Sequence, residues 1–213
     1  MMGRVFKIFV IVILKLFTRW EVEGEENLPP GGPLLVVFNH LAWWDAPLAM
    51  ASLPWEMTGI ALKDLQRIPV IGQLLALGKV IWVDRGRYDR EALRQALTAL
   101  KEGEVLAIAP EGRMSVTGAL ERGKPGPVFI ARKAGVPIMP IGITGTEKVL
   151  GDWRSFRRPS LKVVIGQVFR LPEGREYGSR KEERQADADF ILERLAELLP
   201  PAYRGVYADS VKS

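Results

Sequence analysis

The 213-residue sequence contains no cysteine and a single histidine, His40. The absence of cysteine excludes disulfide bonds, thiolate zinc sites and a cysteine nucleophile. One imidazole is too few for the sites in which two or three histidines bind zinc or iron. Any metal would have to be held by carboxylates, and we predict no metal site.

Hydrophobic residues make up 47% of the chain and charged residues 26%. This balance excludes a disordered chain, a collagen-like chain and a coiled coil, and it is typical of one globular domain. A chain of this length buries about 70% of the surface that its unfolded form exposes. It therefore needs neither disulfides nor a structural metal to hold a core.

Long hydrophobic runs are also missing. The most apolar segment, residues 8–14, has seven residues, whereas a helix needs about 18 to 20 to cross a bilayer. We therefore predict that this segment does not span a membrane. No small-residue cleavage site follows it, so we also predict no removed signal peptide.

The amino-terminal segment has a helical pattern of polarity. Arg4, Lys7, Lys15 and Thr18 form a narrow polar stripe, and the remaining surface of such a helix is apolar. This pattern predicts that residues 1–22 form an amphipathic helix in the membrane interface, with its basic edge toward the headgroups. The alternative is a helix packed on the domain's own core. We expect a peripheral or monotopic protein on the cytoplasmic face of the cell membrane.

Positive charge is concentrated in one segment. The net charge is +5, and residues 148–170 contain six basic residues and one acidic residue. Such a patch attracts phosphates or anionic lipids, and a solvated loop is the alternative. We expect a membrane surface as a partner and no nucleic acid. The six basic residues are Lys148, Arg154, Arg157, Arg158, Lys162 and Arg170.

Short apolar runs typical of strands buried on both faces recur along the chain. They alternate with segments of helical periodicity. This alternation predicts an α/β fold with a mostly parallel, partly mixed central sheet wrapped by helices, in a single domain over residues 23–213. The predicted strands are 34–38, 80–83, 105–109, 138–143 and 161–165, and the predicted helices are 46–51, 74–77, 90–101, 127–134 and 180–199.

Polar side chains follow three of the predicted strands at the point where each strand ends. Ligands of open parallel sheets bind outside the carboxyl ends of the strands. If the sheet is parallel there, we expect these residues to gather at one edge. They are Asn39, His40 and Asp45 after the first strand, Asp84 and Arg85 after the second, and Pro110, Glu111, Gly112 and Arg113 after the third.

The spacing of His40 and Asp45 allows a hydrogen bond between their side chains if the chain turns into a helix between them. The second ring nitrogen of His40 would then be free to take a proton from a substrate hydroxyl. The alternative is a histidine that caps a turn, with Asp45 as the N-cap of the helix.

Two further turns carry groups suited to anions. In Pro110-Glu111-Gly112-Arg113, the glycine permits close approach of the backbone, and its N–H could face an oxyanion or a phosphate. In Asp84-Arg85-Gly86-Arg87, the arginines match phosphate oxygens in pairs. Plain surface turns are the alternative for both.

The common phosphate and hydrolase motifs do not fit. Residues 118–124 match the first positions of a Walker A loop up to Lys124, but Pro125 replaces the serine or threonine that holds magnesium. There is no G-x-G-x-x-G fingerprint and no G-x-S-x-G elbow, which argues against dinucleotide binding and the usual serine hydrolases.

Taken together, four blocks resemble the motifs of the glycerolipid acyltransferase superfamily, in particular the PlsC-type 1-acylglycerol-3-phosphate (lysophosphatidate) acyltransferases. Each block is short, but all four occur in the family's order. They are Asn39-His40-x4-Asp45 for N-H-x4-D, residues 78–85 (GKVIWVDR) for a G-x-I-x-I-D-R strand and turn, residues 109–115 (APEGRMS) for F-P-E-G-T-R-S, and residues 136–141 (VPIMPI) for V-P-I-V-P-V.

The resemblance implies transfer of an acyl group to the free hydroxyl of a lysophospholipid, with 1-acyl-sn-glycerol-3-phosphate giving phosphatidate. The donor would be a thioester of acyl carrier protein or of coenzyme A, which is a co-substrate. The resemblance implies no cofactor. His40, oriented by Asp45, would remove the proton from the attacking hydroxyl, and the Gly112 N–H would stabilise the oxyanion.

The resemblance also implies a set of substrate-binding residues. Arg85 and Arg113 would bind the acceptor phosphate, and Glu111 would hold these arginines or the glycerol. Arg113 and Met114 stand where the family usually has threonine and arginine, which shifts part of the phosphate binding to Arg85, Arg122 and Lys124. The implied set is Asn39, Arg85, Glu111, Gly112, Arg113 and Lys124.

Two other classes of protein fit the same residues. A non-catalytic peripheral lipid-binding protein would use only the amino-terminal segment and the basic patch. A thioesterase or phosphoesterase would use His40 to activate water.

Overall fold

The computed structural model describes residues 2–69, 71–84, 89–173 and 179–211. Its centre is a seven-stranded sheet with the order β1-β7-β6-β2-β5-β3-β4. All neighbouring strands are parallel except β6 and β7, so β1 and β7 run opposite to the other five. The prediction of a mostly parallel, partly mixed sheet is therefore confirmed. The strands are β1 (Arg19–Glu23), β2 (Leu34–Phe38), β3 (Met57–Leu62), β4 (Lys79–Val83), β5 (Val105–Ile108), β6 (Ile138–Thr144) and β7 (Ser160–Ile165).

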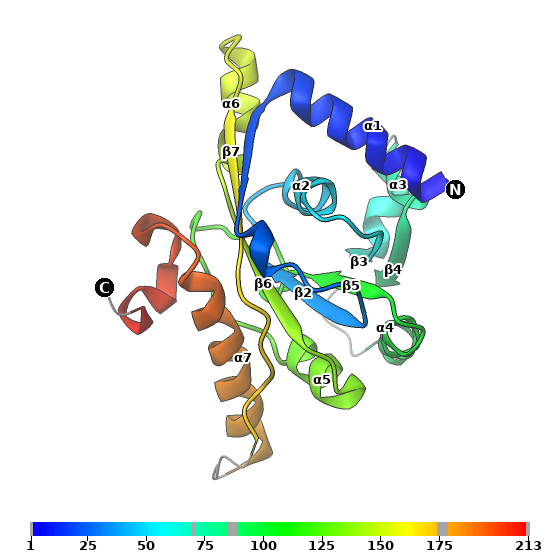
Figure 1. Ribbon diagram of the computed structural model, residues 1–213, viewed down its shortest axis with the longest axis vertical. Helices are drawn as coiled ribbons and strands as arrows, with labels where there is room; N and C mark the ends of the chain where they lie inside the picture. The colour runs from blue at the N-terminus through cyan, green and yellow to red at the C-terminus, as the bar shows by residue number, and fades with distance from the viewer. Residues whose placement is uncertain (1, 70, 85–88, 174–178, 212–213) are drawn as a thin grey trace.

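Helices cover both faces of this sheet (Figure 1). Helices α1 (Met2–Phe17) and α2 (Asp45–Ser52) lie on one face. Helices α4 (Arg90–Lys101), α5 (Pro125–Ala134) and α7 (Arg180–Ala196) lie on the other. The short helices α3 (Ile71–Ala76) and α6 (Val149–Arg154) and five 3-10 turns complete the described part: η1 (Glu25–Asn27), η2 (Lys63–Arg67), η3 (Thr146–Lys148), η4 (Pro201–Tyr203) and η5 (Gly205–Ser210).

Strand β2 shows why the sequence has continuous apolar runs. Leu34, Val36 and Phe38 pack in the cluster under α1 and α2. Leu35 and Val37 pack in the cluster under α4, α5 and α7. All five side chains are buried, and each contributes about 1.5 to 3 kcal/mol relative to an exposed position. A strand covered on both faces therefore has no polar face to alternate with.

The structure contains all five predicted strands, but β1 and β3 were missed. Strand β1 joins the sheet edge beside β7, with Arg19 opposite Ser160. The helix predicted over residues 1–22 is consequently too long, because α1 ends at Phe17. Arg158 explains this end, since its guanidinium donates to the carbonyls of Lys15 and Thr18 at 2.6 and 2.7 Å and satisfies groups that another helical turn would use.

The direction in which α1 turns the polar side chain of Lys7 also differs from the prediction. Lys7 points inward and donates to the backbone carbonyls of Leu53 and Trp55 at the end of α2, and burial lowers the pKa of its amine. Thr18, just beyond the helix, is buried as well. The expected basic edge toward headgroups is therefore wrong for Lys7, which faces the protein, whereas Lys15 is exposed. The side chain of Arg4 lies outside the described part of the structure.

The outward surface of α1 is mostly apolar instead. Its exposed apolar side chains in the described part are Ile8, Phe9, Val12, Leu16 and Phe17, and we call this set the apolar face of α1; Leu16 is 62% exposed, and Lys15 is the charged residue exposed beside them. None of the helices in the described ranges is long and apolar enough to cross a membrane.

Candidate active site

The predicted site residues cluster where β2 and β5 end. These strands are parallel neighbours, with Val37 opposite Ile108. His40 follows β2 after one residue, and Glu111 follows β5 within a tight turn. The parallel pairing brings both turns to one edge of the sheet, as predicted.

His40 and Asp45 form the expected hydrogen bond. The Nδ1 atom of His40 lies 2.8 Å from Oδ2 of Asp45, and the same oxygen accepts the N–H groups of Leu41 and Ala42 at 2.6 and 2.7 Å. Asp45 is fully buried as the first residue of α2. Its carboxylate holds the loop that precedes the helix and does not act as an N-cap, so the capping alternative does not describe this pair.

Thr146 is a further partner of this pair that the sequence analysis missed. Its buried hydroxyl donates to Oδ1 of Asp45, the second carboxylate oxygen. Thr146 begins η3 directly after β6, the other parallel neighbour of β2. Gly145 has a φ of 90°, and a Cβ there would stand 2.1 Å from the carbonyl oxygen of Ser160. A glycine and a threonine after a predicted strand were the only available signal.

The imidazole of His40 is partly open to solvent, with 24% of the side chain exposed. Its ring meets that of Phe38 edge to face, with centroids 6.2 Å apart. Because Asp45 accepts from Nδ1, the neutral ring carries its proton there, and Nε2 is the nitrogen with a free lone pair. The arrangement can accept a proton from a hydroxyl that approaches Nε2.

Glu111 connects the two turns and is almost fully buried. Its Oε1 accepts the backbone N–H of His40 at 3.1 Å, and its Oε2 accepts that of Glu121 at 2.9 Å. Burial raises the pKa of this carboxyl to about 7, although both N–H groups favour its charged form. Arg113 binds Glu121 and not Glu111, whereas Glu111 binds backbone and fixes the position of His40. A contact of Glu111 with Arg85 falls outside the described residues, and its contact with the glycerol stays a prediction.

Backbone groups of the turn at Glu111 also form hydrogen bonds within the protein. The Gly112 N–H donates to the carbonyl of Ala109 at 3.0 Å, so it is not the free oxyanion donor that was predicted. Gly112 adopts a φ of 71°, in the left-handed region that favours glycine, so the shape of the turn accounts for a glycine at this position. The backbone N–H groups of Lys124 and Ser115 then fasten the loop to the carbonyls of Pro110 and His40 at 2.8 and 2.7 Å.

Asn39 does not face a substrate either. Its side-chain amide donates to the carbonyl of Ile143 at 2.8 Å and accepts the N–H of the same residue at 2.7 Å. Asn39 is buried, and both polar atoms of its amide are used. The predicted substrate contact is therefore corrected to a link between the ends of β2 and β6 that positions His40.

Two predicted cationic residues lie at the surface of the same loop. Arg113 donates through Nε and Nη2 to Glu121 Oε2 at 2.9 and 2.6 Å, and the pKa of Glu121 is lowered first by the N–H of Val116 and then by Arg113. Lys124 is exposed, and its stem lies 3.4 Å from the position of a Cβ on Gly112. Arg85 lies outside the described residues.

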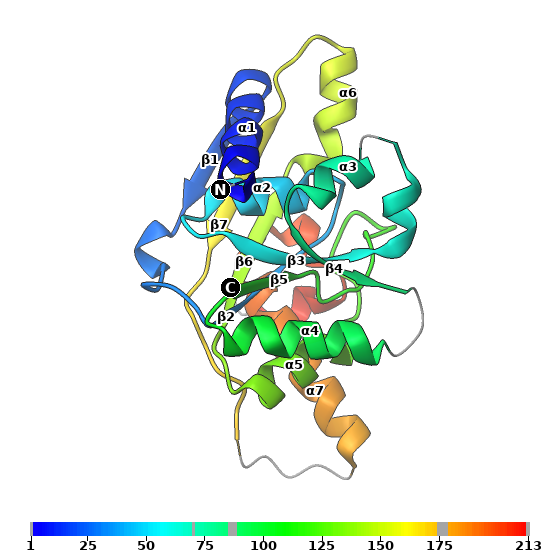
Figure 2. The same cartoon turned by 90° about the vertical axis from the view of Figure 1, so that its right-hand side faces the viewer.

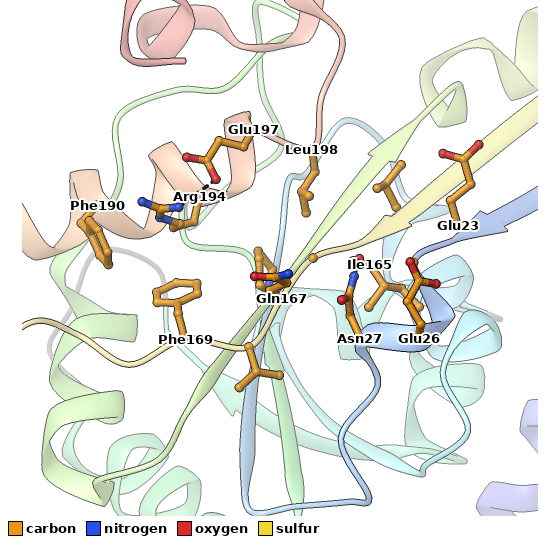
Figure 3. Close-up of a pocket in the computed structure, with 15 residues that line it drawn as sticks. Glu23, Glu26, Asn27, Ile165, Gln167, Phe169, Phe190, Arg194, Glu197 and Leu198 are labelled. Atoms are coloured by element: carbon orange, nitrogen blue, oxygen red, sulfur yellow. Dashed lines mark hydrogen bonds and ion pairs between the residues drawn. The ribbon is translucent and has the colours of Figure 1, made fainter. Parts of the chain in front are cut away.

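A cavity of about 540 Å³ lies elsewhere, between the end of β7 and α7. Figure 3 shows Phe169 and Phe190 on one side and Glu23 and Glu26 on the other. Arg194 pairs within it with Glu197 at 3.1 Å. None of the predicted site residues lines this cavity, so size alone does not locate the chemistry.

Comparisons with known proteins show the family to which this chain is similar. A family model described as Acyltransferase matches residues 19–144. The 1-acyl-sn-glycerol-3-phosphate acyltransferase of Bacillus subtilis is 29% identical over 189 residues, which cover 88% of this chain and 92% of that protein. The chloroplastic 1-acyl-sn-glycerol-3-phosphate acyltransferase BAT2 of Brassica napus is 30% identical over 164 residues, 75% of this chain and 47% of that protein. This chain thus spans about half of the plant relative.

A solved structure shows the same fold. The crystal structure of the 1-acyl-sn-glycerophosphate (LPA) acyltransferase PlsC from Thermotoga maritima matches with a TM-score of 0.69 and 27% sequence identity. The match covers 92% of this chain and 79% of that one.

Proposed function

Because this chain belongs to the Acyltransferase family, whose model matches more than half of it, we propose that it acylates 1-acyl-sn-glycerol-3-phosphate to phosphatidate, with an acyl thioester as donor. One observation carries the proposal: Asp45 holds Nδ1 of His40 at 2.8 Å while the ring remains partly open to solvent. This is the base and orienter of a hydrolase triad without a nucleophile of its own.

The proposed reaction needs one proton carrier. The lysolipid hydroxyl attacks the thioester carbonyl carbon while Nε2 of His40 accepts the hydroxyl proton. The C–O bond forms, the C–S bond breaks, and the imidazolium returns the proton to the leaving thiolate. A base of this kind contributes about 10² to 10⁴-fold to the rate. No acyl-enzyme is required, which suits a chain without cysteine.

The acceptor phosphate is assigned to the loop after β5. Arg113, Arg122 and Lys124 present exposed cationic groups there, and a guanidinium fork matches phosphate oxygens in pairs. Arg113 already binds one carboxylate, Glu121, in this fashion. A bound phosphate would either replace the Glu121 carboxylate as the partner of Arg113 or bind Arg113 beside it.

The apolar face of α1 supports a position at the membrane surface. A helix that turns its apolar residues outward and a lysine inward gains more from contact with acyl chains than from water. The carboxyl end of α1 lies near the site, since Phe17 contacts Trp153 and Trp153 contacts Trp44, with ring centroids 6.2 and 5.0 Å apart. Trp44 directly precedes Asp45, so a lipid entering from this face has a short route to His40.

The test is acyl transfer by the purified protein to 1-acyl-sn-glycerol-3-phosphate, with acyl-CoA and acyl carrier protein thioesters supplied in turn and phosphatidate measured by mass spectrometry. We expect His40→Ala and Asp45→Asn to lower the rate at least about 100-fold. Asp64→Asn is the matched control, because Asp64 is an exposed carboxylate on η2.

Two results would contradict the proposal. Release of free fatty acid in place of phosphatidate would identify a thioesterase. Vesicle binding without any transfer to a lysolipid would identify a lipid-binding protein.

A further inference from the structure

A concave surface of about 500 Å³ is lined by only four residues, Arg19, Phe156, Arg157 and Arg158. We call the three arginines the arginine cluster. The backbone of Arg19 donates to the carbonyl of Pro159 at 2.8 Å, which joins the start of β1 to the loop between α6 and β7. Two segments about 140 residues apart in the sequence therefore supply one set of guanidinium groups.

The charge of the arginine cluster is not compensated within the protein. Among the described residues, none of its members forms an ion pair with a carboxylate. Arg158 donates to two neutral carbonyls, those of Lys15 and Thr18. Strand β1 carries two acidic residues, Glu21 and Glu23. Glu23 pairs with Lys162 at 2.7 Å and not with the cluster. The concave surface thus presents donors that suit an external anion.

Phe156 beside the cluster is held in an unusual position. Its side chain is fully exposed, and its φ is 55°, in the left-handed region that non-glycine residues rarely adopt. The turn is fixed because the N–H groups of Phe156 and Arg157 donate to the carbonyls of Trp153 and Asp152 at 3.1 and 2.8 Å. The ring therefore projects from the protein and has nothing of its own core to pack on.

This surface adjoins the apolar face of α1. Trp153 Nε1 donates to the carbonyl of Phe17 at 3.0 Å, and Arg158 reaches the same end of the helix. Figures 1 and 2 show α1 and α6 at the same end of the molecule. Apolar side chains from α1, the projecting Phe156 ring and three guanidinium groups are thus presented together.

We propose that the arginine cluster binds the headgroup phosphates of anionic phospholipids while Phe156 inserts between their acyl chains. The surface is a second membrane contact beside α1 and makes the protein select anionic bilayers. The inference deepens the proposed function, since it names the lipid surface on which that reaction takes place. Arginine favours phosphate over water through paired, charge-assisted hydrogen bonds, and an aromatic ring beside it is suited to the interfacial layer of a bilayer.

An acidic protein, such as an acyl carrier protein, is the competing partner for three arginines. The apolar surroundings favour the bilayer, because an acidic protein surface would cover the guanidinium groups and leave both Phe156 and α1 in water. The two partners give different results in the experiment below.

The experiment measures sedimentation of the full chain with vesicles of phosphatidylcholine alone and of phosphatidylcholine with phosphatidylglycerol, without substrates. We expect the wild type to bind the anionic vesicles more tightly. Arg19→Glu with Arg157→Glu should weaken that binding about thirtyfold or more, on the scale expected for two basic residues near a charged surface, and should leave binding to neutral vesicles unchanged. Lys181→Glu with Arg184→Glu, two exposed charge reversals on α7 at the opposite face of the sheet, is the matched control.

Phe156→Gly separates membrane insertion from folding. Glycine adopts a φ of 55° without strain, so this variant should unfold at the same temperature as the wild type or higher and yet bind both vesicle types less tightly. Arg158 is left intact because it also holds the end of α1.

Three results would overturn the inference. One is anionic-vesicle binding that the double charge reversal leaves unchanged, and another is vesicle binding that Phe156→Gly does not weaken. The third is a double variant that binds vesicles normally but no longer binds acyl carrier protein, which would assign the cluster to the donor. Acyl transfer in neutral detergent micelles, measured in parallel, reports on the proposed reaction independently of these vesicles.

Discussion

The buried hydroxyl of Thr146 donates a hydrogen bond to Oδ1 of Asp45. The other oxygen of that carboxylate binds His40 Nδ1 and two backbone N–H groups. Asp45 is therefore fixed by donors on both oxygens, and the orientation of the imidazole depends on a residue at the end of a third strand. Such a carboxylate cannot rotate without leaving a donor unpaired in the interior.

Thr146→Val keeps the shape of the side chain and removes this donor. An unpaired buried acceptor costs about 1 to 3 kcal/mol, and we expect kcat to fall about 5- to 100-fold because the imidazole loses its fixed orientation. The KM for the lysolipid should change little, since Thr146 does not contact it in the proposed reaction. Steady-state kinetics of the variant measure both.

Two variants control for this effect. Thr146→Ser retains the hydroxyl and should recover most of kcat. Thr58→Val removes another buried hydroxyl, which lies away from the site and donates to Glu104 at a distance of 2.5 Å. This variant should affect stability but not kcat. Equal loss of kcat in both valine variants would contradict a positioning role for Thr146.

The sequence predicted the sheet where burial leaves a strong signal. Strands such as β2 and β6 are apolar along their length because helices cover both faces. Strand β3 contains Thr58 and Gly59 and is mostly only partly buried, so no continuous apolar run marks it. Strand β1 alternates, with Arg19, Glu21 and Glu23 exposed, and this short pattern was absorbed into the predicted amino-terminal helix.

The predictions for the site are right where a contact joins residues close in sequence. They are wrong where a side chain binds backbone from a distant part of the chain. Asp45 lies five positions after His40, and the expected hydrogen bond is present. Asn39 is bound by Ile143, 104 positions away. Spacing identifies polar residues at the edge of a sheet, but it does not show which of them already bind the protein's own backbone.

Glu111 should make stability depend on pH. Burial raises its pKa from an ordinary value of 4.5 to about 7 in the folded protein. Between these values the folded protein holds a proton that the unfolded chain has released, so the free energy of unfolding falls as pH rises through this window. The stabilisation is complete below pH 4.5 and is lost above the folded pKa of about 7.

Urea unfolding of wild type and Glu111→Gln at pH 5 and pH 8 measures this effect. Glutamine resembles the protonated acid and does not titrate, so the wild type should lose about 2 kcal/mol more than the variant across this range. Glu182→Gln on α7 is the control for an exposed glutamate whose loss should not alter the pH dependence. Parallel pH curves for wild type and Glu111→Gln would disprove a raised pKa.

The apolar face of α1 should determine membrane binding independently of the arginine cluster. Phe9→Gln with Leu16→Gln removes two exposed apolar side chains, and we expect binding to neutral vesicles to weaken at least about tenfold because their burial in acyl chains is lost. Thermal unfolding should change little, since neither residue is buried in the protein.

Phe129→Gln with Val206→Gln is the matched control for this variant. It removes one exposed phenylalanine and one exposed aliphatic residue from α5 and η5. If both double variants bind vesicles like the wild type, α1 is not the membrane contact.

Arg113 should determine the affinity for the acceptor and not the rate of the chemical step. Arg113→Ala removes a charge-assisted hydrogen bond to the phosphate, so we expect the KM for 1-acyl-sn-glycerol-3-phosphate to rise about 10- to 100-fold, with kcat within a few-fold of wild type. Stability should fall by less than about 1 kcal/mol, because the ion pair with Glu121 is exposed on the arginine side. Arg94→Ala removes another exposed arginine that is paired with a glutamate, Glu91 on α4, and should leave both constants unchanged. A normal KM in Arg113→Ala together with a raised KM in Lys124→Ala would move the phosphate site along the loop to Lys124, because only one of the two cations would then reach the headgroup.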